Sequence, residues 1–261
     1  MNNLEEDSRK KYSDSSVYDP RKIVTSLSDA SGTFSSLLQT VKRQLLIQHS
    51  MGRRVLDLGC ANGRHLSEIA SHIRSGIGLD FSPPFIRLAT ETYKDVPNIK
   101  FALADVRALP LADSSIEFAF SFATLYHIND IEAVYAELSR VLTPNGVALL
   151  EIGNSLSLST LVSRQYPAIA QHSRRRIGEH LGTLESHGFT IATWRSFQIL
   201  PMWGDQPRWL APLRHPALEK QIVRHFRGRM LDERISSWPG FRRLAFRHLI
   251  IATRGAGVVP N

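Results

Sequence analysis

Three aspartates stand at the ends of short apolar runs, in a pattern that suits the binding of a nucleoside. Asp57, Asp80 and Asp105 each close such a run, and Asp80 comes 23 positions after Asp57. A carboxylate about 20 residues after a glycine turn can accept hydrogen bonds from a ribose diol. Asp105 could accept one from an adenine amino group, and Asp57 one from an ammonium. Because parallel strands bring their carboxyl ends to one edge of a sheet, these carboxylates should converge on one crevice.

A tight turn, Gly59-Cys-Ala-Asn-Gly63, follows Asp57. Gly59 has no Cβ, so the chain can turn there and a ligand can lie against it. Gly63 does the same where a helix begins, and the start of a helix offers unpaired N–H groups. The sequence has neither the three-glycine pattern of dinucleotide folds nor the Gly-Lys-Ser/Thr of a P-loop. The turn is therefore not typical of a phosphate site, and S-adenosylmethionine (SAM) is the phosphate-free alternative for such a sheet.

Each of these features has a plainer explanation when it is taken alone. A glycine turn after a strand is often ordinary strand-to-helix geometry, and any one of the aspartates could cap a helix. Cys60, the single cysteine, has no base or charged partner beside it, so we interpret it as small packing in the loop and not as a nucleophile. Three aspartates in register with three strands, together with the glycines, favour a cofactor site.

The order of the apolar segments predicts an α/β fold with a mostly parallel sheet. Strands alternate with amphipathic helices, and parallel neighbours need such crossover connections, so helices should cover both faces. We expect strands at 54–58, 75–79, 98–104, 115–122, 146–152, 189–200 and 248–253, and helices at 34–48, 65–73, 84–93, 130–142, 175–187 and 218–229.

Four segments resemble successive motifs of the class I SAM-dependent methyltransferases, and most resemble the branch that acts on small molecules and lipids. These segments are Val55–Gly63, Gly76–Ser82, Leu103–Pro110 and Leu138–Ile152. The resemblance implies a Rossmann-like three-layer sandwich with a seven-stranded sheet whose last strand inserts antiparallel. It also implies that SAM is the cofactor. It implies Asp57, Gly59, Ala61 and Gly63 around the methionine part of SAM, Asp80 at the ribose, and Asp105 with Val106 at the adenine.

Cys60, Phe81, Ser82 and Phe122 complete the cofactor site that we predict. In one place the sequence departs mildly from the family, because Ala61-Asn62-Gly63 stands where the family often has Gly-Thr/Ser-Gly.

The methyl acceptor should lie beyond the fourth strand, where Tyr126 and His127 are our candidate catalytic residues. His127 is the candidate general base, because an imidazole changes its charge near neutral pH. The alternative is a structural histidine that caps the next helix or packs against it. Glu151 and Asn154, at the end of the fifth strand, could also touch the acceptor. We predict no metal site, because the histidines lack i, i+4 spacing and cysteine partners.

Four parts of the chain are predicted. Residues 1–50 form an N-terminal helical cap, in which Tyr12 and Tyr18 could fold over the cofactor as a lid or belong to a disordered tail. Residues 51–200 form the SAM-binding core. Residues 201–247 form a basic, tryptophan-containing insertion that should help to choose the substrate, and 248–261 supply the last core strand and a tail.

The formal net charge of +8 is concentrated near the end of the chain. Residues 201–261 carry eleven Lys and Arg against four Asp and Glu. This excess could serve a large anionic or lipid-like acceptor, an anionic membrane surface or an RNA, with arginines on phosphates and tryptophans on bases. It could equally be a solvated arginine face over a tryptophan-rich core. No RNA-binding module is recognisable, so we rank an RNA methyltransferase below a small-molecule one.

The composition favours a soluble globular protein. Hydrophobic residues make up 43%, apolar runs stop short of a membrane span, and Met1–Tyr18 lacks the apolar core of a secretory signal. We therefore expect a cytoplasmic protein, peripheral at a membrane if the basic region binds lipid. A nicotinamide-dependent oxidoreductase and a non-catalytic partner with a SAM fold are the remaining alternatives, which the missing third glycine and the intact loop disfavour.

Overall fold

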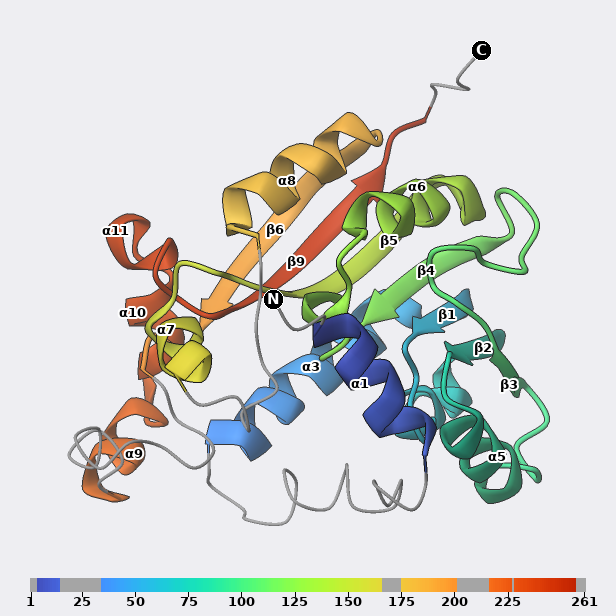
Figure 1. The fold of residues 1–261 in the computed structure, drawn as a ribbon, viewed down its shortest axis with the longest axis horizontal. Helices are drawn as coiled ribbons and strands as arrows, with labels where there is room; N and C mark the ends of the chain where they lie inside the picture. The colour runs from blue at the N-terminus through green and yellow to red at the C-terminus, as the bar shows by residue number, and fades with distance from the viewer. Residues whose placement is uncertain (1–3, 15–33, 166–174, 201–215, 227, 257–261) are drawn as a thin grey trace.

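The computed structural model describes residues 4–14, 34–165, 175–200, 216–226 and 228–256. Within these residues, seven strands form one sheet in the order β3-β2-β1-β4-β5-β9-β6 (Figure 1). β9 runs antiparallel to both of its neighbours, and the other strands are parallel to one another. The predicted sheet with its inserted last strand is confirmed. The strands are β1 (Arg54–Leu58), β2 (Ser75–Asp80), β3 (Ile99–Leu103), β4 (Ile116–Ser121), β5 (Leu142–Gly153), β6 (Phe189–Phe197) and β9 (Arg247–Arg254).

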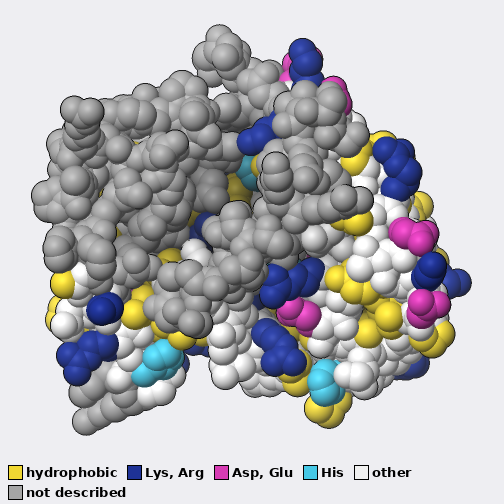
Figure 2. Space-filling view, turned by 90° about the horizontal axis from the view of Figure 1, so that it is seen from below, with side chains coloured by type: hydrophobic (Ala, Val, Ile, Leu, Met, Phe, Trp, Pro, Cys, Tyr) yellow, Lys and Arg dark blue, Asp and Glu magenta, His cyan; other side chains and the backbone are white. Residues whose placement is uncertain are grey.

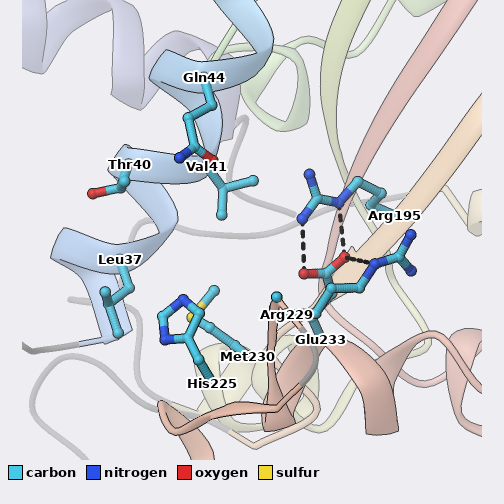
Figure 3. A pocket seen from close by; sticks show the side chains of 10 residues that line it. Leu37, Thr40, Val41, Gln44, Arg195, His225, Arg229, Met230 and Glu233 are labelled. Carbon is cyan, nitrogen blue, oxygen red and sulfur yellow. Dashed lines mark hydrogen bonds and ion pairs between the residues drawn. The ribbon is translucent and has the colours of Figure 1, made fainter.

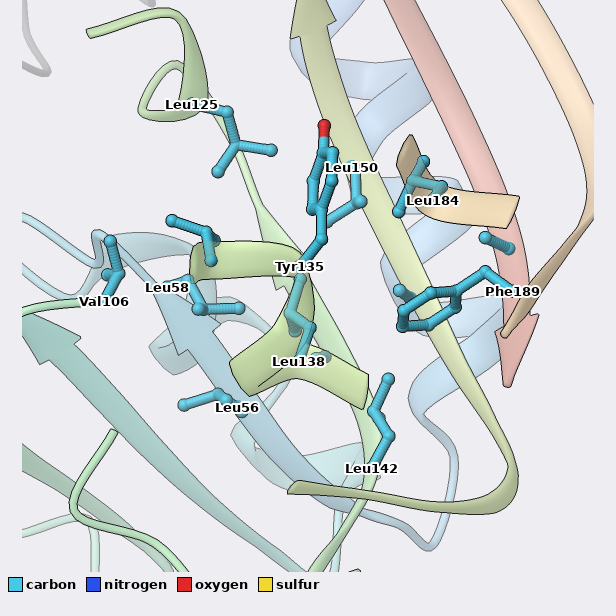
Figure 4. Close-up of a cluster of buried hydrophobic side chains, with 14 of the residues drawn as sticks. Leu56, Leu58, Val106, Leu125, Tyr135, Leu138, Leu142, Leu150, Leu184 and Phe189 are labelled. Carbon is cyan, nitrogen blue, oxygen red and sulfur yellow. The ribbon is translucent and has the colours of Figure 1, made fainter. Parts of the chain in front are cut away.

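Helices cover both faces of the sheet, as expected for parallel strands. Leu56 and Leu58 of β1 point to one face, where they share a buried cluster with Tyr135 and Leu138 of α6 (Figure 4). The intervening Val55 belongs to the cluster on the other face. This alternation follows from the two-residue period of a strand. α6 (Ile131–Val141) and α8 (Ile177–Ser186) lie on the first face, and α3 (Phe34–Ser50) and α4 (Arg64–Glu68) on the second.

The helices on the carboxyl side of the strands begin at capping residues. Ser82 caps α5 (Pro83–Thr92), and two prolines occupy its first turn, where a missing N–H costs nothing. Asp130 caps α6 by accepting a hydrogen bond from the Ala133 N–H at 3.2 Å. The helix predicted at 65–73 is shorter, because α4 gives way to the 3₁₀ turn η1 (Ala70–His72).

The region after β6 differs from the prediction. The helix expected at 218–229 ends early, as α9 (Pro216–Ile222), and a small hairpin of β7 (His225–Phe226) and β8 (Arg229–Met230) follows. Gly228 has φ +76° in this hairpin, a conformation that a helix cannot contain. Three short helices were not predicted: α7 (Leu158–Gln165), α10 (Leu231–Ser236) and α11 (Pro239–Arg242).

The N-terminal segment 1–50 contributes α3 and a short helix, α1 (Leu4–Ser13), which contacts α5 and the 3₁₀ turn η2 (Leu125–His127). Tyr18 and two of the tryptophans, Trp203 and Trp209, lie outside the described residues. Among the helices that are described, none has the length and apolar character needed to cross a bilayer.

Candidate functional site

The predicted glycine turn links β1 to α4 and depends on both of its glycines. Gly59 has φ +73° and Gly63 has φ +77°, in the left-handed region that favours glycine. A Cβ on Gly59 would stand 2.3 Å from Oγ1 of Thr124, and one on Gly63 would stand 2.5 Å from the ring of Phe101. A side chain at either position would clash. Both residues must therefore be glycine for the turn to pack against Thr124 and Phe101.

Asp80 holds this turn in place from the end of β2. Its carboxylate accepts hydrogen bonds from the N–H groups of Ala61 and Ser82, both at 2.9 Å. Ala61 needs this support because its φ of 46° is unfavourable for a residue with a Cβ. Burial raises the pKa of Asp80. Ser82, and not Asp80, caps α5, so the capping explanation for Asp80 is wrong.

Asp57 is the least satisfied acid of the site. Its side chain is buried, at 3% exposure, and its Oδ2 has no hydrogen-bond partner among the described residues. Burial raises the pKa of Asp57 well above its ordinary value, and the neighbouring charge of Asp80 raises it further. A buried carboxylate oxygen without a donor is costly. A ligand that brings a cation or an N–H group to this oxygen would remove that cost.

Asp105 follows β3, and two arginines pair with it. Arg107 donates to it at 2.7 and 3.0 Å, and Arg9 of α1 forms a second ion pair. The hydrogen bond from Arg107, followed by those from Arg9, lowers the pKa of Asp105. The guanidinium of Arg9 also lies 5.1 Å from the ring centroid of Phe81. The adenine contact expected at Asp105 stays a prediction, and it requires Arg9 to move. Val106, beside Asp105, is buried.

Tyr12 of α1 reaches the same crevice, as the predicted lid would. Its carbonyl oxygen accepts a hydrogen bond from Ser82 Oγ at 2.5 Å. Its ring lies 6.2 Å from Phe85 and 6.3 Å from His127, between ring centroids. α1 therefore connects the side of Asp105 with the side of His127.

Tyr126 and His127 lie together in η2, directly after β4. Their ring centroids are 4.6 Å apart. Tyr126 is buried against Phe246, and burial raises its pKa. His127 is half-buried. Since Asp130 caps α6, the alternative that His127 is the cap of that helix is wrong.

A buried group of charges beside these residues was not predicted from the sequence. Glu151 of β5 accepts a hydrogen bond from Lys42 of α3 at 2.8 Å and forms an ion pair with Arg247 of β9. Glu151 also accepts a hydrogen bond from the Ala123 N–H at 2.8 Å. Burial alone would raise the pKa of Glu151, but the two cations lower it to about 2. Lys42 also lies 4.9 Å from the ring centroid of Phe122.

A weak signal for Lys42 was present in the sequence. This lysine stands inside the apolar stripe of α3, three positions before Leu45 and four after Leu38. A charged residue in such a stripe indicates a buried partner. Arg247, at the start of the last strand, gives no such signal.

Comparison with known proteins identifies the domain that carries this site. Residues 56–150 match a protein family described as a methyltransferase domain. Residues 56–150 therefore carry a methyltransferase domain, and the fold around them is that of class I SAM-dependent methyltransferases.

Two relatives illustrate the similarity of the chain to methyltransferases. It is 32% identical over 120 residues to an O-methyltransferase of Pyrenophora dematioidea, over 44% of this chain and 42% of the relative. It is 30% identical over 149 residues to a probable SAM-dependent methyltransferase of Mycolicibacterium smegmatis, over 57% of this chain and 56% of the relative. The chain thus spans about half the length of these curated relatives.

Solved structures show the same fold. Geranyl diphosphate C-methyltransferase from Streptomyces coelicolor aligns with a TM-score of 0.62 at 16% identity, over 96% of this chain and 98% of that one. That structure contains Mg²⁺, geranyl diphosphate and S-adenosyl-L-homocysteine.

Two further residues that the sequence singled out pack inside the protein. Asn154 is fully buried and uses its amide to join three segments: it donates to the carbonyls of Arg243 and Ala245 and accepts from the N–H groups of Leu156 and Ile177. These bonds occupy the amide, so Asn154 holds the three segments together and does not contact the methyl acceptor. Cys60 is buried, and burial raises the pKa of its thiol well above the ordinary value, which agrees with packing.

A separate pocket of about 160 Å³ lies between α3 and the β7–β8 hairpin (Figure 3). Its most strongly bonded groups are Arg195 and Glu233, joined by two hydrogen bonds of 2.7 and 2.8 Å. Arg229 lies 3.7 Å from the same carboxylate. None of the residues that line this pocket belongs to the predicted cofactor site.

Figure 2 shows one face of the molecule, on which lysine and arginine side chains stand next to acidic ones over the described part. A nucleic-acid site would favour a stripe of one sign.

Proposed function

We propose that the chain is an enzyme that binds SAM at the carboxyl ends of β1, β2 and β3 and transfers its methyl group to a small-molecule or lipid-like acceptor. The observation that carries the proposal is the buried, unpartnered Oδ2 of Asp57 beside the Gly59–Gly63 turn. SAM carries an α-ammonium and a sulfonium and no phosphate. A cationic ligand relieves the desolvation of Asp57, whereas a pyrophosphate would worsen it.

The residues of the crevice fit such a ligand. Asp57 would accept from the ammonium, and the free lone pairs of Asp80 would accept from the ribose hydroxyls. Asp105, Val106 and Phe81 would surround the adenine. Cys60 lies in the turn, Ser82 follows β2 and Phe122 follows β4, and these side chains would complete the wall.

The protein's own contribution to the reaction is positioning and proton removal. SAM supplies an already activated methyl group, so in-line orientation of the acceptor provides much of the catalysis. Where the acceptor atom carries a proton, His127 would take it on its imidazole, and the Tyr126 hydroxyl beside it would orient the acceptor. Oxygen, nitrogen and carbon acceptors are all compatible with these roles.

The character of the acceptor is suggested by two features. The relatives and structures include an O-methyltransferase and an enzyme crystallised with geranyl diphosphate, which is a small lipid-like molecule. The rim near β9 also exposes Trp238, Phe241 and Leu244, beside the exposed Arg243. Apolar and basic side chains together suit an amphiphile or the surface that holds it.

Calorimetry with SAM tests the cofactor half of the proposal. We expect the wild-type chain to bind SAM, Asp80→Ala to bind it at least ten-fold more weakly, and the surface control Asp95→Ala to bind like wild type. Equal binding by Asp80→Ala, or no binding by the wild type, would contradict the proposal. NADH titrated in parallel should not bind.

Incubation of cell extract with methyl-labelled SAM tests the acceptor half. The label should appear in the low-molecular-mass or lipid fraction, and it should survive ribonuclease treatment. If ribonuclease abolishes labelling, the acceptor is RNA. If His127→Ala labels at the wild-type rate across the pH range, His127 is not the base.

A further inference from the structure

Buried charges meet at the end of β5. Lys42 and Arg247 both face Glu151, and all three are withdrawn from water: Lys42 is 2% exposed, Glu151 0%, and the Arg247 side chain 12%. His65, across the ring of Phe122, adds no charge, because burial lowers its pKa to about 3. Within the described residues, these two cations face one carboxylate. An anion that approached the group would meet both positive charges, and burial strengthens that attraction.

Gln198 adds an unused donor to this group. It is fully buried, and its Oε1 accepts a hydrogen bond from Arg247 Nε at 2.7 Å. Its Nε2 has no hydrogen-bond partner within the described part of the chain. A buried amide NH₂ without an acceptor is costly, and in native proteins it calls for an explanation.

The backbone of Gln198 is strained as well. Its φ is +68°, an unfavourable value for a residue with a long side chain. The strain is held from both sides, because the Gln198 N–H donates to Asp232 at 2.7 Å and its carbonyl accepts from the Phe246 N–H at 3.1 Å. Strain that is held so firmly, on a residue with an unused donor, is typical of a ligand-binding position.

Lys42, Glu151, Gln198 and Arg247 lie at the half of the sheet edge where the methyl acceptor is expected. Gly153 of β5 is in register with Arg247 of β9, which is in register with Phe197 of β6. Gln198, which follows β6, therefore lies at the same edge of the sheet as Arg247. Tyr126 hydrogen-bonds to Arg247 at this edge. The proposed SAM residues stand on β1, β2 and β3, at the other half of this edge.

We propose that Arg247, Gln198 and Lys42 bind an anionic group of the methyl acceptor, a carboxylate or a phosphate. This inference rests on the proposed function, because it names the substrate class of the same site. The anion accepts hydrogen bonds from Gln198 Nε2 and from the guanidinium, and its charge is attracted to Lys42. Acceptors that carry such a group are bound, and their neutral counterparts are rejected.

Three variants separate this role from a structural one. Gln198→Glu has nearly the same shape, pairs with Arg247 and adds a negative charge of its own. Gln198→Gly removes the amide together with the acceptor of Arg247 Nε, and it relieves the backbone strain, which offsets part of that loss. Lys42→Met removes one cation and leaves Arg247 and Glu151 paired. The control is Gln44→Glu, the same exchange at an exposed position of α3.

Binding of three small probes tests the proposal. Acetate, inorganic phosphate and acetamide are titrated against the folded chain, with and without saturating S-adenosylhomocysteine, by ligand-observed NMR. We expect wild type and Gln44→Glu to bind acetate or phosphate at least ten-fold more tightly than acetamide, and the tighter of the two identifies the anion. Gln198→Glu, Gln198→Gly and Lys42→Met should lose that preference.

Two results would overturn the proposal: equal binding of anions and acetamide by the wild type, or an unchanged preference in the folded Gln198 variants. If the protein binds S-adenosylhomocysteine but no anion, this inference is contradicted and the proposed function is not. A chain that prefers the anions but binds no S-adenosylhomocysteine contradicts the proposed function and leaves the anion site standing.

Discussion

Arg9 of α1 forms an ion pair with Asp105, a residue 96 positions further along the chain. Asp105 follows β3, where the adenine of SAM is expected, and Arg9 also covers the ring of Phe81. α1 thus occupies the nucleoside end of the crevice. Arg9 and an adenine compete for the same carboxylate and the same aromatic face, so the ion pair has to open before SAM can bind.

We expect Arg9→Ala to bind SAM faster and up to about five-fold more tightly. The Arg9 and Asp105 side chains are 40% and 32% exposed, and such an ion pair is worth no more than about 1 kcal/mol. Stopped-flow association and calorimetry measure the two quantities. Lys10→Ala, on the exposed side of the same helix, should change neither. Weaker binding by Arg9→Ala would show that Arg9 stabilises the bound state and does not compete with the ligand.

Asp57→Asn should stabilise the ligand-free protein while it weakens SAM binding at least ten-fold. The folded state raises the pKa of Asp57, so this carboxyl favours folding when protonated, and that contribution is lost as the pH rises through the raised pKa. The gain in unfolding free energy from Asp57→Asn, about 1–3 kcal/mol at neutral pH, should therefore shrink towards pH 4. Urea denaturation at several pH values measures it.

The exposed Asp95→Asn is the control for this substitution and should leave both the stability and the SAM affinity unchanged. If Asp57→Asn lowers the stability at neutral pH, the carboxylate has a partner that holds it, and the argument for a cationic ligand fails.

The sheet could be predicted from the sequence, because its signals are local. Each strand from β1 to β5 is a short apolar run between turn residues, and α6 carries its apolar stripe beside a capping aspartate. The hairpin after α9 could not be, since residues 224–228 have no alternating pattern and the sequence does not show the positive φ that Gly228 adopts.

The place of the three aspartates and the glycine turn could likewise be predicted, since they follow strands in a regular spacing, whereas their contacts with SAM stay a prediction. The anion group could not be predicted, because Lys42, Glu151, Gln198 and Arg247 meet only through the pairing of β5, β9 and β6. The contact of Arg9 with Asp105 depends in the same way on tertiary packing. A single sequence shows which residues end a strand, but not which distant side chain meets them.

Glu151→Gln should be among the most destabilising single substitutions in the core. It removes the carboxylate that Lys42 and Arg247 share as an ion-pair partner, and breaking a buried ion pair costs about 3–5 kcal/mol. Lys42→Met should cost less, because it leaves Arg247 and Glu151 paired. Glu117→Gln, which removes a surface ion pair with Arg74, should cost less than about 1 kcal/mol. Urea denaturation compares the three, and a loss for Glu151→Gln as small as that for Glu117→Gln would contradict this role of the buried carboxylate.

The exposed aromatic pair of α11 should bind the protein to lipid. Trp238 is 67% exposed and stacks on Phe241, with ring centroids 6.3 Å apart and planes only 2° from parallel, and Leu244 and Arg243 stand beside them. Aromatic and basic side chains together favour the headgroup region of an anionic bilayer. We expect the protein to cosediment with vesicles that contain phosphatidylserine.

Trp238→Ser should weaken that binding about ten-fold, because roughly 50–80 Å² of apolar surface, at about 25 cal/mol per Å², no longer enters the bilayer. Met51→Ser removes a similarly exposed apolar side chain, at 66%, from the opposite edge of the sheet, before β1, and should have no effect. Equal losses in the two variants would mean that the chain adheres without a specific surface. No cosedimentation of the wild type would mean that the α11 pair does not act at a membrane, and a lipid-like acceptor would then have to reach Tyr126 and His127 from solution.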